Sequence, residues 1–279
     1  MNIHEFIMQA LHEDIREGDH STLSSINADA QGSAVLKVKE NGIIAGLAVA
    51  EIIFKQVQPD AKIAFYKKDG DAVVYGDKAF TVWAKVHTIL MCERLVLNIM
   101  QRMSGIASLT NLYVQKIKDY PTHLLDTRKT TPLFRWFEKE AVRIGGGMNH
   151  RFGLYDMIML KDNHIDYCGG IEKAIDKANA YCQQKNLDIK IEVETRSLDD
   201  VQRVLHHGGV QRIMLDNFSP SLLADVVKMI DNKYETEASG GITLDTIASY
   251  AATGVQYISA GAIIHHAVSM DLSLKAIKA

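Results

Sequence analysis

The sequence is poor in cysteine, in proline and in long apolar runs. Its three cysteines, Cys92, Cys168 and Cys182, are widely spaced and match no metal-ligand pattern, so we expect reduced structural thiols in a cytoplasmic protein. No apolar run is long enough to span a bilayer, which argues against a membrane protein. The opening stretch, Met1–Ala10, mixes polar and apolar residues and is typical of an amphipathic helix, not of a signal peptide.

The chain also lacks an excess of positive charge. It holds 31 lysine and arginine residues against 34 aspartate and glutamate residues, which gives a formal net charge of −3 and a pI near 6.4. A field of that sign does not recruit nucleic acid or anionic lipid, so any anion must be bound by a local cluster of cations. We therefore expect neither nucleic acid nor a membrane among the partners.

The N-terminal part has the pattern of a small α+β layer. Its expected elements are strands over 33–39, 61–67 and 78–86 and helices over 47–57 and about 88–117. Gly105 is expected to interrupt the long helix. Together these elements predict an antiparallel sheet with a helix across it.

After Tyr120 the pattern changes to strand, loop and helix, repeated. The expected strands are Thr122–Leu125, Tyr155–Leu160, Ile189–Val193, Arg212–Leu215, Tyr234–Ala238 and Gln256–Ser259. The helices expected between them include Ile171–Gln184, Leu198–His206, Ser221–Met229 and Leu244–Ala252. Repeated βα units imply a parallel sheet, and this many in one run predict a closed or nearly closed α/β barrel.

Each expected strand of the barrel ends on a polar residue or a glycine. In chain order these are Asp126-Thr127-Arg128-Lys129, Lys161-Asp162-Asn163-His164, Glu194, Asp216-Asn217, Ser239-Gly240-Gly241 and Ala260-Gly261. In such barrels the carboxyl ends of the strands form the active site. Helix capping explains Asp, Ser and Asn at these positions, but it does not call for Arg, Lys and Glu, so we favour a catalytic site.

The residue types at these strand ends suit a substrate with more than one negative group. Arginine presents a planar fork to carboxylate or phosphate, and lysine adds a compact charge. Glu194 and Asp216 would repel such an anion unless they hold Mg²⁺ or ribose hydroxyls. The backbone N–H groups of Ser239–Gly241 and Ala260-Gly261 fit a monophosphate. The set indicates phosphoribosyl transfer from phosphoribosyl pyrophosphate, and spacing alone does not name the acceptor.

Several stretches also carry a family resemblance. The long helix contains Glu93-Arg94-Leu95-Val96-Leu97-Asn98 and then Ser104-Gly105-Ile106-Ala107. The segment from Asp126 to His164 matches almost throughout, and Ile191–Glu194, Leu215–Phe218 and Glu237–Ile242 continue the match in order. From about Glu13 to its end the chain resembles the quinolinate phosphoribosyltransferases.

That resemblance implies an α/β protein with two domains. An N-terminal α+β sandwich is expected over 1–105, with the tail 267–279 packing back on it, and an α/β barrel of parallel strands over 106–266. The family works as a homodimer with active sites shared between chains, and a larger oligomer is left open. The implied reaction transfers phosphoribose to quinolinate with decarboxylation, giving nicotinate mononucleotide, pyrophosphate and CO₂ in de novo NAD biosynthesis, with Mg²⁺ as cofactor.

The resemblance also implies a role for individual residues. The expected ligands of the quinolinate carboxylates are Arg128, His150 and Arg151, with Arg94 reaching in from the neighbouring chain. The expected catalytic residues are Lys129, Lys161, Glu194 and Asp216. The expected phosphoribosyl pyrophosphate site adds Ser239, Gly240, Gly241, Gly261 and His265 to those four. Glu194 and Asp216 are also the expected Mg²⁺ ligands, directly or through water.

The sequence departs from the family pattern at a few uncharged or peripheral positions. Leu133 stands where glycine is usual, Glu140 where tyrosine is frequent, Ile144 where cysteine is common, and Ile264 and His266 where threonine and serine flank the histidine. None of these changes replaces a charged residue of the expected site, so they bear on loop shape and not on the reaction.

Three other functions fit parts of the pattern. A phosphosugar isomerase or lyase would explain Ser239–Gly241 but not the arginine-rich stretch. A paralogue of the family acting near molybdate uptake is opposed by the complete Asn149–Asp156 run. A nucleic-acid-binding protein would use the basic run Arg128–Arg151, but that run is interleaved with Glu138 and Glu140.

Overall fold

A computed structural model describes residues 2–277, and the chain divides into two compact units. The first unit comprises the chain up to Leu109, the segment Trp136–Gly145 and the chain from Ala267 onward. The second comprises Thr110–Arg135 and Gly146–His266. Residues 136–145, which the sequence placed with the barrel, therefore group with the N-terminal part of the chain.

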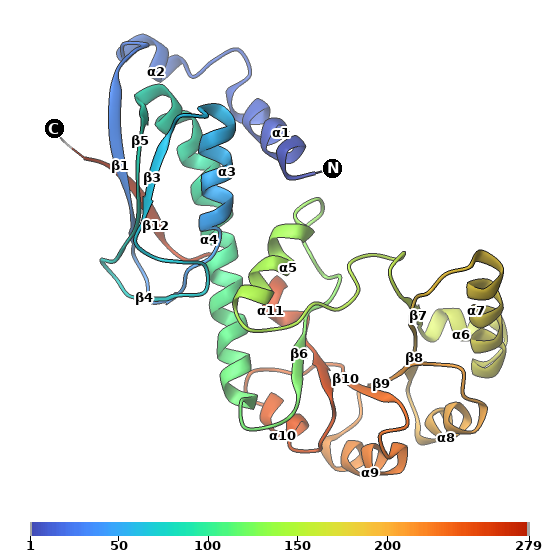
Figure 1. Ribbon diagram of the computed structural model, residues 1–279. Coiled ribbons are helices and arrows are strands. Elements are labelled where there is room, and N and C mark those ends of the chain that lie inside the picture. Colours follow the sequence, from blue (N-terminus) through green and yellow to red (C-terminus); the bar gives the residue numbers. More distant parts are fainter. Residues whose placement is uncertain (1, 278–279) are drawn as a thin grey trace. The chain divides into compact units, whose positions relative to one another are not determined.

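The first unit is built on an antiparallel sheet in the order β12-β1-β5-β3 (Figure 1). The strands are β1 (Gln31–Val38), β3 (Lys62–Phe65), β5 (Lys78–Lys85) and β12 (Leu272–Ala276), and β2 (Gly42–Ile43) pairs separately with β4 (Ala72–Val73). Alternation directs Leu36 and Phe80 to a buried face, as expected for strands with one face on the core. The tail strand β12 pairs antiparallel with β1.

The helices of the first unit are α1 (Ile3–Ile15), α2 (His20–Ser25), α3 (Leu47–Val57), most of the long α4 (Val86–Ile117) and most of α5 (Arg135–Ile144). Of these, α3 packs on the apolar face of the sheet. Helix α1 begins at a capping box, in which Asn2 accepts from the N–H of Glu5 and the Glu5 carboxylate accepts from the N–H of Asn2. Phe54 of α3 packs edge-on against Phe80 of β5, with ring centroids 6.2 Å apart.

The predicted interruption at Gly105 is wrong, because α4 runs unbroken from Val86 to Ile117. The lack of a side chain at Gly105 instead lets the chain near Val268 pack closely against the helix. A Cβ atom there would lie 2.0 Å from the carbonyl oxygen of Val268, so only glycine lets the tail of the chain cross this helix.

The second unit is a parallel, barrel-like sheet in the order β6-β11-β10-β9-β8-β7. Its strands are β6 (His123–Leu125), β7 (Ile158–Leu160), β8 (Ile191–Thr195), β9 (Arg212–Asp216), β10 (Glu235–Ser239) and β11 (Tyr257–Ser259). An isolated parallel bridge joins Leu125 to Met148 beside β6. The predicted α/β class, with an antiparallel N-terminal sheet and a parallel barrel, is confirmed.

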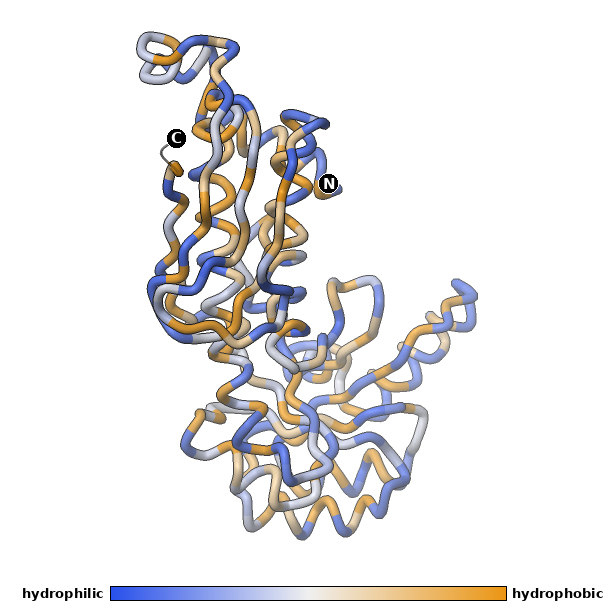
Figure 2. The backbone as a smooth tube through the Cα atoms, turned by 60° about the vertical axis from the view of Figure 1, so that its left-hand side comes forward, coloured by the Kyte–Doolittle hydropathy of each residue, from blue (hydrophilic) through white to orange (hydrophobic). Residues whose placement is uncertain are grey.

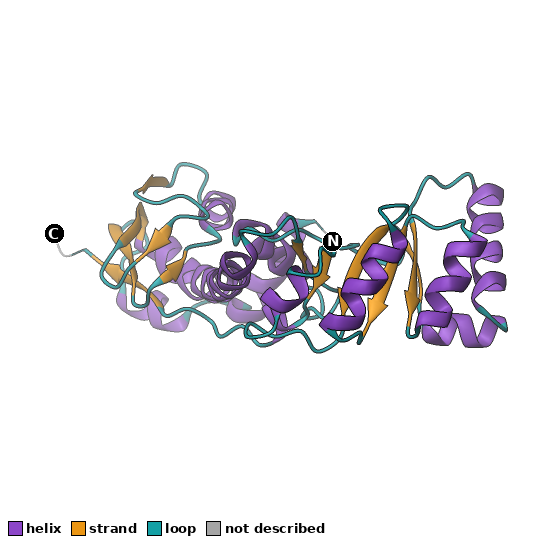
Figure 3. Ribbon diagram, turned by 90° about the horizontal axis from the view of Figure 1, so that it is seen from below, coloured by secondary structure: helices purple, strands orange, loops and turns teal. Residues whose placement is uncertain are grey.

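Helices follow the barrel strands as predicted. They are α6 (Asp162–Cys168), α7 (Ile171–Lys185), α8 (Leu198–His207), α9 (Pro220–Ile230), α10 (Ile247–Ala251) and α11 (Ala262–His265). Hydrophobic and hydrophilic residues recur with the helical repeat along α7, α8 and α9 (Figure 2). The buried residues of these three helices are apolar. Figure 3 shows the strands of the unit flanked by helices. No helix among residues 2–277 is long and apolar enough to cross a membrane.

Leu133 lies in an exposed turn with φ of 62° and 78% of its surface exposed. This is the position where the family usually has glycine. A left-handed conformation costs an L-residue about 1–2 kcal/mol. Glycine removes that cost, although it adds about 0.4–1 kcal/mol of chain entropy to the unfolded state.

We expect Leu133→Gly to raise the free energy of unfolding by about 0.5 kcal/mol, as the difference between these two terms. Urea denaturation followed by circular dichroism measures the change. Leu154→Gly is the matched control, since Leu154 is equally exposed but has no positive φ, and it should be destabilising. Equal effects of the two substitutions would contradict a conformational cost at Leu133.

Candidate active site

The carboxyl edge of the barrel sheet brings most of the predicted site residues together. Asp216 ends β9 and Ser239 ends β10, and the parallel register makes them direct neighbours. The Ser239 hydroxyl donates to Oδ1 of Asp216 at 2.5 Å, and the Asn217 amide donates to Oδ2 at 2.6 Å. The carboxylate of Asp216 is therefore held in one orientation at the edge of the sheet.

Gly240 follows Ser239 in a turn that no other residue fits. Its φ is +97°, and a Cβ atom would lie 2.1 Å from Oδ1 and 2.8 Å from the backbone nitrogen of Asn217. Gly241 also has a positive φ, +61°, but a Cβ there would meet no atom within 4 Å. The two glycines thus differ in crowding, although both adopt left-handed backbone conformations.

Lys161 and Glu194 form an ion pair at the same edge of the sheet, on the strands beyond β9. Lys161 follows β7 and Glu194 lies near the end of β8, and Nζ is 3.2 Å from Oε2. The lysine is half-exposed and the glutamate is buried. The backbone N–H of Lys161 donates to Nδ1 of His164 at 3.0 Å, which fixes the start of α6.

Lys129, Gly261 and His265 meet at the other end of the sheet. A Cβ on Gly261 would lie 2.9 Å from Cδ of Lys129 and 3.2 Å from Nε2 of His265. Partial burial lowers the pKa of His265, and the positive charges of His266 and Lys129 act in the same direction. The absence of a side chain at Gly261 therefore leaves room for a cation and an imidazole at the start of α11.

Two guanidinium groups lie near each other at this edge without a carboxylate partner. Arg151 is half-buried and donates to the carbonyl of Met157 at 3.1 Å. Burial lowers the pKa of Arg151, and the positive charge of nearby Arg128 lowers it further. Within residues 2–277 neither arginine is within ion-pair distance of an acidic group. An arginine pair with no carboxylate in direct contact favours a ligand with two negative groups.

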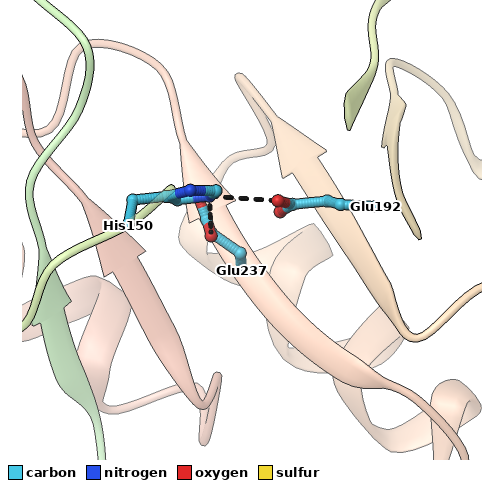
Figure 4. A group of neighbouring side chains, drawn as sticks. All are labelled: His150, Glu192 and Glu237. Carbon is cyan, nitrogen blue, oxygen red and sulfur yellow. Dashed lines mark ion pairs between the residues drawn. The ribbon is translucent and has the colours of Figure 1, made fainter. Parts of the chain in front are cut away.

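His150 lies in the interior of the barrel, where its ring meets Glu192 and Glu237 (Figure 4). Its Nε2 lies 3.0 Å from Glu192 and 3.1 Å from Glu237, and its side chain is 4% exposed. The backbone N–H of Arg151 donates to Nδ1 at 2.6 Å. Both ring nitrogens thus have protein partners, and the role of His150 as a substrate ligand stays a prediction.

The contacts within this interior cluster shift the pKa values of His150 and Glu192. Burial acts to lower the pKa of His150, but its bonds to Glu192 and Glu237 outweigh burial and raise it. The ring of His150 is therefore more basic than that of an unperturbed histidine. Burial and the charge of Glu237 raise the pKa of Glu192, whereas His150 and Arg212 act in the opposite direction.

Arg212 balances the remaining charge of the interior. It lies 3.0 Å from Glu237 and 2.9 Å from Glu235, and its guanidinium stacks 4.2 Å from the ring centre of Tyr257. The pKa of Glu237 is lowered by His150 and Arg212, although burial opposes this. Arg212 thus gives the buried carboxyl of Glu237 a cationic partner in direct contact.

Asp126 orders the loop that carries His150 and Arg151. It follows β6, is completely buried, and accepts from the Asn149 amide at 2.7 Å and from the backbone N–H of His150 at 2.8 Å. A buried carboxylate satisfied by such donors is a rigid anchor. It therefore fixes the start of the arginine-bearing segment.

No role was expected from the sequence for Glu192, Arg212 or Glu237, although a signal for them was present. Side chains two apart on a strand share a face, so Glu192 lies on the face of Glu194, and Glu237 on that of Ser239. The same rule pairs Arg212 with Asp216. If the strand ends form the site, charged residues two or four positions earlier in the same strands point into the barrel interior.

Arg94 lies in the first unit, exposed on α4. Its expected place in the site of a neighbouring chain stays a prediction. The remaining predicted residues, Lys129, Lys161, Glu194, Asp216, Ser239, Gly240, Gly241, Gly261 and His265, all lie at or just beyond the strand ends of the second unit.

The donor chemistry of this edge fits Mg²⁺. Glu194 and Asp216 offer carboxylate oxygens, and Mg²⁺ is usually held by one or two carboxylates together with water and substrate phosphates. Among the described residues, one cluster of three potential ligands is close enough for an ion on protein atoms alone, namely His150, Glu192 and Glu237. That cluster is buried and pairs with Arg212, whereas Glu194 and Asp216 lie at the strand ends and stay the predicted Mg²⁺ ligands.

The fold and the site define a phosphate-handling α/β barrel enzyme of the phosphoribosyltransferase class. One edge of the parallel sheet carries an arginine pair with no carboxylate in direct contact, two lysines, two carboxylates and a glycine turn. This edge is where such barrels carry out their chemistry.

Comparison with known families identifies the group. Residues 106–275 match the model of the quinolinate phosphoribosyl transferase C-terminal domain, and residues 19–104 match the model of its N-terminal domain. The chain belongs to the quinolinate phosphoribosyltransferase family.

Individual relatives are similar over nearly their whole length. The chloroplastic nicotinate-nucleotide pyrophosphorylase [carboxylating] of Arabidopsis thaliana is 44% identical over 96% of this chain and 81% of its own. A probable nicotinate-nucleotide pyrophosphorylase of Synechocystis is 40% identical over 99% of this chain and 93% of its own. The solved nicotinate-nucleotide pyrophosphorylase from Francisella tularensis superposes with a TM-score of 0.91 at 36% identity, covering 99% and 96% of the two chains.

Proposed function

We propose that this chain transfers phosphoribose from phosphoribosyl pyrophosphate to quinolinate with loss of CO₂, giving nicotinate mononucleotide for NAD biosynthesis. The observation that carries the proposal is the pair of guanidinium groups, Arg128 and Arg151, at the same sheet edge as the phosphate-handling turn. Quinolinate has two carboxylates, and a planar fork binds each of them better than a point charge does.

The acceptor and the activated ribose occupy different parts of the edge in this proposal. Arg128 and Arg151 hold quinolinate, with His150 and the neighbouring chain's copy of Arg94 as further ligands. The backbone of Ser239–Gly241 and Gly261 holds the 5′-phosphate, and His265 lies at the same rim. Lys129 and Lys161 lie where the pyrophosphate leaves, and Glu194 and Asp216 hold ribose hydroxyls or the metal.

The transfer step needs positioning and charge more than a protein nucleophile. The pyridine nitrogen forms a bond to C1 of the ribose as the bond to pyrophosphate breaks, through an oxocarbenium-like transition state. Glu194 and Asp216 stabilise the positive charge that develops on the ribose, and Lys129 and Lys161 stabilise the leaving group. Mg²⁺, when bound, neutralises part of the pyrophosphate charge.

Decarboxylation follows from the product of that transfer. The alkylated nitrogen carries a positive charge, so the electron pair left on the neighbouring carbon is stabilised when its carboxylate leaves as CO₂. That carbon then takes a proton. The arginine pair serves this step by holding the ring, since the remaining carboxylate keeps its guanidinium contact.

A direct assay tests the proposed function. Purified protein is incubated with quinolinate, phosphoribosyl pyrophosphate and Mg²⁺, and nicotinate mononucleotide and CO₂ are measured. A parallel reaction contains nicotinate in place of quinolinate. Product from quinolinate alone is expected. A folded protein that forms no product from quinolinate would overturn the proposal and favour a paralogue that uses another anion.

Arg151→Ala should lower kcat/KM for quinolinate about tenfold or more, because a charge-assisted hydrogen bond contributes about 1.5–3 kcal/mol. Arg151→Lys should recover part of the loss, since it restores the charge without the fork. Arg143→Ala is the matched control, because Arg143 is exposed and paired with Glu140 on α5. A neutral Arg151→Ala variant would remove this residue from the site.

We also propose a homodimer with shared sites, no nucleic-acid partner and a cytoplasmic location. Several plant relatives are named as chloroplastic or mitochondrial enzymes, so cell fractionation is the check on location. Sharing makes a sharper prediction. Mixed Arg94→Ala and Glu194→Ala chains should regain activity that neither has alone, because one of the two sites in a mixed dimer is intact. No recovery despite subunit exchange, followed by mass spectrometry, would argue against sharing.

A further inference from the structure

The outer face of the antiparallel sheet in the first unit carries lysines and no acidic residue of its own strands. Strands β1, β3, β5 and β12 contain five lysines and no aspartate or glutamate, in a chain whose net charge is −3. Lys85 lies 3.7 Å from Asp29. Among residues 2–277 no carboxylate is within ion-pair distance of the other four lysines. They are Lys37, Lys62, Lys78 and Lys275. Four unpaired lysines on one sheet create a local positive field.

Strand register places these lysines on one face. Lys37 is the partner of Lys78 across β1 and β5, and Val35 is the partner of both Thr81 and Lys275. Side chains directly opposite on neighbouring strands point to the same side. The other side of the sheet is closed by helix α3, whose Phe54 contacts Phe80. The basic side is therefore the one without a helix.

A hollow of about 390 Å³ lies on this basic side. We call it the lysine hollow, and the side chains that matter to its chemistry are Lys37, Lys78, Lys275, Tyr66, Thr81 and Trp83. Small-molecule sites in proteins have volumes of about 300–1,000 Å³, so the hollow is large enough for one small ligand.

Two aromatic rings line the lysine hollow. Trp83 is 44% exposed and Tyr66 is 54% exposed, which is unusual for side chains of this size. The Tyr66 hydroxyl is hydrogen-bonded to Oγ1 of Thr81 at 3.1 Å, which holds its ring at the wall. Aromatic faces beside lysines bind a planar ring and an anion together.

We propose that the lysine hollow binds a nucleoside phosphate, with the phosphates on Lys37, Lys78 and Lys275 and the base stacked on Trp83. A single nucleotide fits better than a nucleic-acid strand, because the hollow is small and the chain as a whole is negatively charged. All of its lining lies in the first unit, whereas the lysines, carboxylates and glycine turn of the catalytic edge lie in the second.

Trp83 offers a direct reporter. The chain has two tryptophans, so a Trp136→Phe variant leaves Trp83 as the sole tryptophan fluorophore. Titration with ADP should quench its emission saturably. Adenosine should bind much more weakly, because it lacks the charge, and pyrophosphate should bind without the same quenching. The affinity for ADP should fall as salt is added, since the lysines are exposed to solvent.

Lysine variants in the Trp136→Phe background locate the site. The Lys37→Gln/Lys275→Gln double variant should weaken ADP binding by about tenfold or more, given the strength of charge-assisted contacts. Lys62→Gln is the matched control: it removes an unpaired lysine of the same sheet that does not line the hollow, and ADP binding should hold. Turnover of quinolinate should be unchanged in all of these variants.

Each alternative result overturns the proposal in a different way. Equal losses from Lys62→Gln and from the double variant would mean a diffuse positive field and no site. Tight binding of a single-stranded oligonucleotide without binding of ADP would mean a surface for nucleic acid. Loss of turnover together with loss of ADP binding would place this face in the catalytic site. Absence of any quenching in folded protein would remove the nucleotide altogether.

Discussion

Arg212→Met should lower the free energy of unfolding by about 3–5 kcal/mol, which is the usual effect of breaking a buried ion pair by removing one partner. Glu192 and Glu237 are both completely buried, and Arg212 is the arginine that balances them. Without it Glu237 loses its guanidinium partner inside the barrel. Urea denaturation of the purified variant measures the loss.

Two further variants decide whether the cause is the buried charge. Arg203→Met removes an exposed arginine paired with Glu172 on the helices outside the sheet, and it should cost about 0–1 kcal/mol. The double variant Arg212→Met/Glu237→Leu also removes the buried carboxylate and should recover much of the stability, because Glu235 keeps its contact with Lys190. A loss below about 1 kcal/mol in Arg212→Met would show that water reaches this layer and solvates the carboxylates.

Gly240→Ala should lower kcat/KM for phosphoribosyl pyrophosphate on the order of a hundredfold, comparable to removal of one preorganised donor from an anion site. The added Cβ would lie 2.1 Å from the Asn217 side chain and 2.8 Å from its backbone nitrogen, so the turn must move. Its backbone N–H groups then no longer point at the 5′-phosphate. Steady-state kinetics with a melting temperature for each variant gives the answer.

Gly241→Ala is the comparison that isolates crowding. Its φ is also left-handed, but its Cβ would meet nothing within 4 Å, so we expect a loss no greater than about tenfold from backbone strain alone. Equal losses at the two positions would mean that strain, and not the contact with Asn217, explains both. An active Gly240→Ala enzyme would remove the turn from the phosphate site.

The sequence predicted the architecture well because hydrophobic periodicity is a local property. The change from alternation to βα repeats after Tyr120 was enough to predict a parallel sheet, and the strand ends followed from it. The strand before Lys161 was placed too early, since Tyr155 lies in the loop and β7 begins at Ile158. An apolar run beside a loop does not mark its own boundary.

Tertiary contacts explain what the sequence did not predict. Gly105 was expected to break a helix, but its conformation is helical and its small size serves the crossing of Val268. The ring of His150 turns inward because Glu192 and Glu237, on two other strands, meet it there. Segment 136–145 joins the first unit through contacts such as Phe137 with Phe6. None of these partners is near in sequence.

The charged interior of the barrel also protects against misfolding. Side chains alternate along a strand, so a slip of β8 by one residue would exchange Glu192 and Glu194 with Ile191 and Val193. The glutamates would then lie beneath the helices, away from His150, Arg212 and Lys161, and the hydrophobic side chains would face one another across the ionic layer. An aliphatic interior would tolerate such an error at less cost. The ionic layer therefore favours the native register of β8 over a one-residue slip by more free energy than an aliphatic layer would.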